Sequence, residues 1–133
     1  MIYDSHVIIN YLRERQGLPA ISVQESNLVS AIDGVTDSLI ILFMAKRSGL
    51  DVTEDKLLFR LQLERIPVSL QWLEAQAASG QFNAWSVASN ALVCLLDWAR
   101  FRELYAFDQY PELCAVRDRF SEKPIVKQTY PVL

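Results

Sequence analysis

Residues 85–104 have the pattern of a central, buried helix. Residues 91–96 form an unbroken apolar run, and Val87 and Trp98 extend it round nearly the whole helical circumference. A surface helix would keep one polar face, so neighbours should cover this helix on every side. Polar residues, Asp97 among them, interrupt the run before it reaches the length of a bilayer span. We therefore expect the core of a soluble protein.

Two long amphipathic patterns precede the central stretch. Ser22 and Glu25 have the spacing of a capping box, in which each side chain bonds the other's backbone N–H, and this predicts the start of a long helix. A second capping box over residues 51–54 predicts another long helix, and the two should pack antiparallel. Pro67 lies inside the second pattern, where the missing backbone donor predicts a kink near Arg65.

Shorter helical patterns lie at both ends of the chain. Residues 5–15 form a first amphipathic helix, and Pro111 suits the first turn of a helix after the central one. Pro124 ends or restarts that last helix, and residues 125–133 should lie against the bundle. The apolar face of the first helix consists of Val7, Ile8, Tyr11 and Leu12. Together the patterns predict an all-α bundle of about five helices.

Composition narrows the classes of function. A chain of 133 residues with 51% hydrophobic content should form one compact domain. The net charge is −3 and the only basic cluster is Lys46 with Arg47, so we expect no nucleic-acid partner. The N-terminus has neither a basic segment nor an apolar signal core, which predicts a cytoplasmic protein without membrane association. Cys94 and Cys114 lie far apart in apolar patterns, so they should be reduced packing residues.

Catalytic and metal-binding motifs are missing from the sequence. It contains no metal-ligand spacing, no glycine-rich phosphate loop and no paired carboxylates on one helix face, so we assign no catalytic residue and expect no metal. The single histidine, His6, has no nucleophile or acid beside it that would suggest a catalytic group. We expect His6 to be a solvent-facing residue of the first helical turn.

Asp4 and Ser5, at the start of the first helix, are the candidate ligand-binding residues. The free N–H groups and positive dipole of a helix N-terminus favour a carboxylate, and the Ser5 hydroxyl adds a donor. Asp4 could pair with an ammonium group, so the two residues suit the two charges of a γ-glutamyl group. The simpler interpretation is that Asp4 or Ser5 merely caps the helix.

Short motifs around the central helix point to a family. Ser86 can cap the helix, which ends in Leu-Asp-Trp-Ala-Arg-Phe-Arg at residues 96–102. Tyr-Pro-Glu-Leu follows at residues 110–113, and Lys-Pro at residues 123–124. This series resembles the helical half of bacterial cytosolic glutathione transferases. That family usually has Asp where this chain has Ser89, so we expect a weaker start to the central helix.

The N-terminal helix extends the resemblance. Asp4-Ser5 and the amphipathic residues after it are similar to the third helix of the family's thioredoxin-like half, where an acidic-Ser pair meets glutathione. The resemblance implies that residues 1–17 are a remnant of that half and that residues 18–133 are the C-terminal helical domain. It also implies glutathione as a substrate, and an apolar electrophile beside Trp98. A core tryptophan is the simpler interpretation of Trp98.

Two functions compete on this basis. The first is a glutathione S-transferase-like protein, truncated and inactive alone, because most of the thioredoxin-like half that carries the family's catalytic residue would precede Ser5. The alternative is a non-enzymatic helical module that binds a partner protein through an apolar face. Either way we expect a homodimer or other homo-oligomer through the first helix, whose apolar face would otherwise meet water. The competing outcome is that this helix folds back onto its own bundle.

Overall fold

The computed structural model describes residues 1–52 and 55–132, and within them the chain is a bundle of six helices without strands. The all-α expectation is confirmed, with one helix more than predicted because Pro124 starts a short helix of its own. The helices are α1 (Ser5–Arg15), α2 (Val23–Arg47), α3 (Leu57–Ala78), α4 (Val87–Phe101), α5 (Pro111–Ser121) and α6 (Pro124–Gln128).

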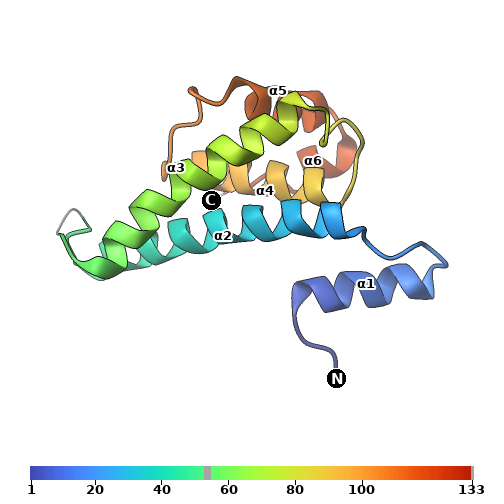
Figure 1. Cartoon of the computed structure of the whole chain (residues 1–133), viewed down its shortest axis with the longest axis horizontal. Coiled ribbons are helices and arrows are strands. Elements are labelled where there is room, and N and C mark those ends of the chain that lie inside the picture. The colour runs from blue at the N-terminus through green and yellow to red at the C-terminus, as the bar shows by residue number, and fades with distance from the viewer. Residues whose placement is uncertain (53–54, 133) are drawn as a thin grey trace.

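Helices α2 to α5 enclose the core. The long helices α2 and α3 run antiparallel against each other, α4 packs on α2, and α5 packs on both α3 and α4 (Figure 1). The short α6 packs on α5 and its Val126 is buried, so α6 lies against the bundle as expected, whereas Tyr130 and Val132 are exposed and residue 133 lies outside the described residues. The largest fully buried apolar side chains come from α2, α3, α4, α5 and the connecting loops: Phe82, Phe107, Ile32, Ile66, Leu70, Leu73, Leu92, Leu96 and Leu113.

The first turn of α4 has its backbone donors satisfied inside the bundle. Ser86 Oγ accepts from Ser89 N at 3.3 Å, and Ser89 Oγ accepts from Ser86 N at 2.7 Å, which together form a capping box. The Glu25 carboxylate, on α2, accepts from Val87 N at 2.9 Å and from Ala88 N at 3.3 Å. The expectation of a weak helix start is wrong, because the Ser89 hydroxyl accepts the hydrogen bond from Ser86 N that an aspartate at this position would accept.

Glu25 also corrects the prediction for the start of α2. The Ser22 hydroxyl accepts from Glu25 N at 3.1 Å, as a capping box requires, but the Glu25 side chain reaches α4 instead of Ser22 N. Glu74 makes the equivalent contact between α3 and α5, where its two carboxylate oxygens accept from Glu112 N at 2.9 Å and Leu113 N at 3.0 Å. Each carboxylate lies at the positive end of a neighbouring helix dipole.

The start of α3 differs from the sequence pattern. The capping box expected over residues 51–54 includes residues 53 and 54, which lie outside the described residues, and α3 begins only at Leu57. The helix continues through Pro67, which lies on its exposed face, so the kink near Arg65 stays a prediction. An exposed position suits this proline, because the Leu63 carbonyl left without a backbone partner can bond to water.

Helix α2 has the composition of a possible membrane span. Judged by length and hydropathy alone, it is the one helix in the described part of the chain that could cross a bilayer. However, Leu28, Ile32, Val35 and Leu39 are buried in the core cluster, and α2 packs on both α3 and α4. A core helix passes the same test of length and hydropathy, and this packing favours a soluble protein.

Helix α1 lies apart from the bundle (Figure 1). None of its residues is buried, and none of the other helices packs closely against its backbone.

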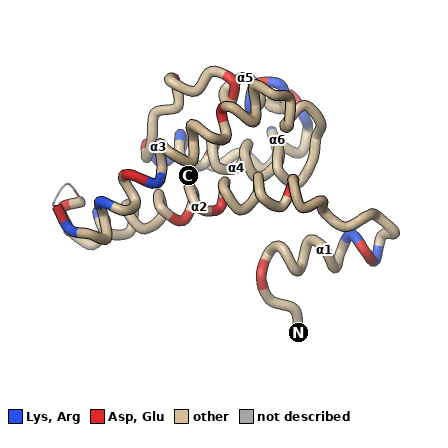
Figure 2. The backbone as a smooth tube through the Cα atoms, in the orientation of Figure 1, with Lys and Arg blue, Asp and Glu red and all other residues tan. Residues whose placement is uncertain are grey.

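Basic residues are spread over the helices, in the last turns of α1, α2 and α4 and on α3, α5 and α6 (Figure 2). The expected lack of a nucleic-acid partner stays a prediction.

We predict that Glu25→Ala lowers the free energy of unfolding by about 1 to 3 kcal/mol, because it leaves two backbone donors of α4 without their acceptor. Chemical denaturation of the variant measures the loss. Glu64→Ala is the matched control, since Glu64 is exposed on α3 and its removal should change the free energy by less than about 0.5 kcal/mol. Equal stability of the two variants would contradict the role of Glu25.

Candidate ligand-binding cleft

One face of α4 is left uncovered by the bundle. Val87, Asn90, Ala91, Cys94 and Trp98 recur at the spacing of a single helical face, and all five are half-buried or exposed. The opposite side of α4 is fully packed. The expectation that neighbours cover this helix on every side is therefore wrong for this face, and the open face forms the floor of a cleft.

Three hollows border this face. The first, of about 380 Å³, lies between α1, α2 and α4 and includes Ser5 and Asn90 in its lining. The second, of about 290 Å³, lies between α2 and α4 and reaches Cys94 and Trp98. The third, of about 200 Å³, lies between α4 and the C-terminal segment and is also lined by Asn90, Cys94 and Trp98. Because neighbouring hollows share lining residues, we treat them as one surface, the α4 cleft.

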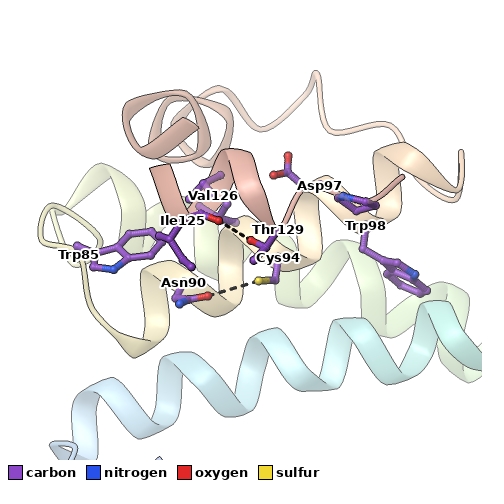
Figure 3. Close-up of a pocket in the computed structure, with 10 residues that line it drawn as sticks. Trp85, Asn90, Cys94, Asp97, Trp98, Ile125, Val126 and Thr129 are labelled. Carbon is purple, nitrogen blue, oxygen red and sulfur yellow. Dashed lines mark hydrogen bonds between the residues drawn. The ribbon is translucent and has the colours of Figure 1, made fainter. Parts of the chain in front are cut away.

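The end of the α4 cleft beside α6 is mainly apolar. Trp85 and Trp98 lie at opposite ends of this hollow, with Asn90 and Cys94 between them (Figure 3). The Cys94 thiol donates to Asn90 Oδ1 at 3.4 Å, and Ile125 covers the hollow from α6. Two indole rings around a few polar atoms suit a partly apolar ligand.

A buried carboxylate, Asp97, forms part of one wall of the same hollow and is paired with a half-buried arginine. Asp97 is 4% exposed, and its Oδ1 lies 2.7 Å from Arg117 Nε on α5. The hydrogen bond to Asp97 raises the pKa of Arg117 above its usual range, so the guanidinium stays charged and neutralises the carboxylate. The ion pair between Asp97 and Arg117 therefore holds α5 against α4.

The two cysteines have different surroundings. Cys114 packs against the core as expected, but Cys94 is exposed on the floor of the α4 cleft, so the packing prediction is wrong for Cys94. Both are free thiols. Partial burial raises the pKa of the Cys94 thiol although the residue as a whole is exposed, and the negative charge of Asp97 raises this pKa further. A thiol with a raised pKa is largely protonated at neutral pH and is a poor nucleophile.

The two candidate residues on α1 have different places. Asp4 caps the helix, and its Oδ1 accepts from His6 N at 2.9 Å and Val7 N at 3.3 Å. Its backbone has φ 75° and ψ 132°, which residues other than glycine seldom adopt. Ser5 lines the first hollow, at the opposite end of the α4 cleft from Trp98. Trp98 is half-buried and packs against the core, as the simpler interpretation expected, while also lining the cleft.

His6 is not simply solvent-facing, which corrects the sequence prediction. Its Nε2 lies 2.6 Å from Asp33 Oδ2 on α2, and both residues line the first hollow with Ser5. Sequence reasoning also missed Asn90 and Cys94 as cleft residues. Their spacing of four residues, with Trp98 four residues further on, was the available signal. Among the described residues, no group of three or more His, Cys, Asp or Glu side chains could hold a metal ion.

Comparison with known proteins rests on the structure alone, because no family model and no curated protein matches the sequence. A glutathione transferase family member from Pseudomonas fluorescens Pf-5, solved with bound S-(propanoic acid)-glutathione, aligns with a TM-score of 0.81 over 98% of this chain and 71% of its own. The fold is the C-terminal helical fold of glutathione transferases. The same family member with bound glutathione aligns with a TM-score of 0.82, over 99% of this chain and 69% of its own.

A second protein shows the same likeness. The glutathione S-transferase of Methylobacillus flagellatus KT, solved with glutathione bound, has a TM-score of 0.79 and covers 98% of this chain with 70% of its own. Sequence identity is 24% for this protein and 23% for the Pseudomonas structures. At this level of sequence identity, the structural likeness shows the fold of the chain but not its ligand or its chemistry.

We predict that Arg117→Met lowers the free energy of unfolding by about 3 kcal/mol, because it leaves the buried Asp97 carboxylate without its partner. Thermal and chemical denaturation measure the loss. Lys127→Met is the matched control, since it breaks an exposed pair with Glu122 and should cost less than about 1 kcal/mol. The double variant Asp97→Leu with Arg117→Met should recover part of the loss. No recovery would show that the arginine acts through something other than the carboxylate.

Proposed function

We propose that this protein is glutathione S-transferase-like and binds glutathione in the α4 cleft. The γ-glutamyl group lies at the N-terminus of α1 against Asp4 and Ser5, and an apolar electrophile lies toward Trp98. The observation that carries the proposal is that the hollow lined by Ser5 shares residues of α4 with both hollows lined by Trp98, Ala91 with one and Asn90 with the other. The solved proteins of the same fold with bound glutathione support it.

The start of α1 suits a γ-glutamyl group in three ways. Ser5 is exposed, so its hydroxyl can donate to the ligand's carboxylate beside the positive end of the helix dipole. In the described part of the chain, both bonds that Asp4 accepts go to Oδ1, which leaves Oδ2 for the ligand's ammonium group. The uncommon backbone of Asp4 also supports a site, because strained conformations cluster where ligands are held.

We further propose that residues 1–133 bind glutathione without activating its thiol. The raised pKa of Cys94 makes that side chain a poor nucleophile, and His6 is already engaged with Asp33. Residues 1–17 then correspond to the third helix of a thioredoxin-like half and residues 18–133 to the helical domain. In this proposal, conjugation requires a group outside these 133 residues. Two free thiols fit a cytoplasmic protein.

We predict weak, saturable binding of reduced glutathione, measured by calorimetry or by NMR titration. Ser5→Ala should weaken it about tenfold, because the variant loses one hydrogen bond to a charged group. Ser30→Ala, at an exposed serine of α2, is the control and should leave the affinity for glutathione unchanged.

With glutathione and an aromatic electrophile, the chain should show no saturable conjugation. A saturable rate that Ser5→Ala abolishes would contradict the proposed lack of thiol activation.

The alternative function is a helical module that binds protein, and the surface of α1 favours it. Val7, Ile8, Tyr11 and Leu12 are 53%, 40%, 40% and 51% exposed, so the structure leaves this face uncovered. We propose a second copy of the chain as its occupant, which would make the protein a homodimer. Pairing the two faces would bury aliphatic side chains, each of which contributes about 1.5 to 3 kcal/mol of binding free energy when fully covered. A different protein partner could cover the same face.

We predict that sedimentation over a wide concentration range shows reversible self-association. The double variant Ile8→Glu/Leu12→Glu should abolish it while the circular dichroism of the bundle stays native, because α1 contributes no buried residue. The exposed pair Leu57→Glu/Leu61→Glu on α3 is the control for a general effect of added charge. A wild-type monomer at all concentrations would end the homodimer proposal.

A further inference from the structure

The N-terminal turn of α1 is attached to the bundle through one side-chain pair. Among the hydrogen bonds of the described residues, the bond between His6 Nε2 and Asp33 Oδ2, at 2.6 Å, is the one that joins α1 to another helix. The other bonds that leave α1 go to the segment between α1 and α2: Arg13 Nε donates to the Pro19 carbonyl at 2.9 Å, and Asn10 Oδ1 accepts from Ile21 N at 3.4 Å.

These contacts fix α1 at its C-terminal end. Its C-terminal end continues into the segment that leads to α2, and the bonds of Asn10 and Arg13 hold that end in place. Close to its other end, the half-buried Ile9 lines the same hollow as the buried Val29, but no residue of α1 is fully buried. The bond between His6 and Asp33 is therefore the directed polar contact that fixes the position of the N-terminal turn.

His6 belongs to the same turn as the proposed glutathione ligands. Its backbone N–H donates to Asp4 Oδ1, and its ring lines the first hollow together with Ser5 and Asp33. A ring that is fixed on α2 fixes the cap and the serine hydroxyl next to it relative to α4. Small displacements matter here, because a charged ligand needs its donors within hydrogen-bond distance at the same time.

We propose that His6 and Asp33 are a positioning pair that holds the glutathione-binding turn of α1 over the α4 cleft. The pair acts by fixing the turn of α1 that carries Asp4 and Ser5. This inference rests on the proposed function. The side chains of His6 and Asp33 are 32% and 47% exposed, so the effect on affinity is moderate rather than total.

The first experiment follows α1 in the ligand-free chain by ¹⁵N relaxation. In the wild type, amides of residues 6–12 should tumble with the bundle, whereas His6→Leu and Asp33→Ala should add independent nanosecond motion to α1 alone. Asp37→Ala is the matched control, because Asp37 is exposed one turn further along α2. His6→Gln should keep the wild-type relaxation, because the amide Nε2 of the glutamine can reach Asp33 as the imidazole Nε2 does.

The second experiment titrates the same variants with reduced glutathione. Affinity should fall about tenfold in His6→Leu and Asp33→Ala, and stay within about twofold of wild type in Asp37→Ala and His6→Gln. Unchanged α1 relaxation in His6→Leu would overturn the positioning role even if glutathione binds. If α1 is released in the variants but the wild-type chain binds no glutathione, the proposed function has failed, while the attachment of α1 through His6 and Asp33 stands.

Discussion

The bundle depends on the hydrogen bonds at the first turn of α4. The backbone donors of this turn lie inside the protein and need acceptors there. A helix start leaves four N–H groups without partners in its own helix. Here two serines and one glutamate provide the acceptors, and the glutamate comes from α2. This fixes the place of α4 along α2. One face of α4 then remains uncovered between α2 and the C-terminal segment, and that face is the floor of the cleft.

Local signals in the sequence were enough to place most of the helices. Apolar spacing and the caps at Asp4, Ser22 and Ser86 correctly predicted the start of α1, α2 and α4. Where the side chains of the caps would go was less predictable. Glu25 has the spacing of a capping box within α2, yet its carboxylate bonds to α4. Spacing along one helix cannot predict a partner from another helix, because that choice depends on how the two helices pack.

The candidate site was predictable only in part, for the same reason. The chemistry of a helix N-terminus pointed to Asp4 and Ser5, and the resemblance pointed to Trp98. His6 was misjudged, because its partner Asp33 lies 27 positions away in the sequence and meets it only through the path of the chain between α1 and α2. Asn90 looked like an interruption of a buried helix and Cys94 like one of its packing residues, since the sequence does not show which face of an apolar helix stays uncovered.

The order of helix contacts has a consequence for how the chain folds. Each pair of helices in close contact is adjacent in the chain or separated by a single helix: α2 with α3, α2 with α4, α3 with α5, α4 with α5, and α5 with α6. Helices that are adjacent in the chain close short loops and lose little loop-closure entropy, so α2 and α3 can pair early, whereas α2 meets α4 across 62 positions and can join it later. Since α1 takes part in none of these contacts, the bundle can form first and α1 can settle on it afterwards.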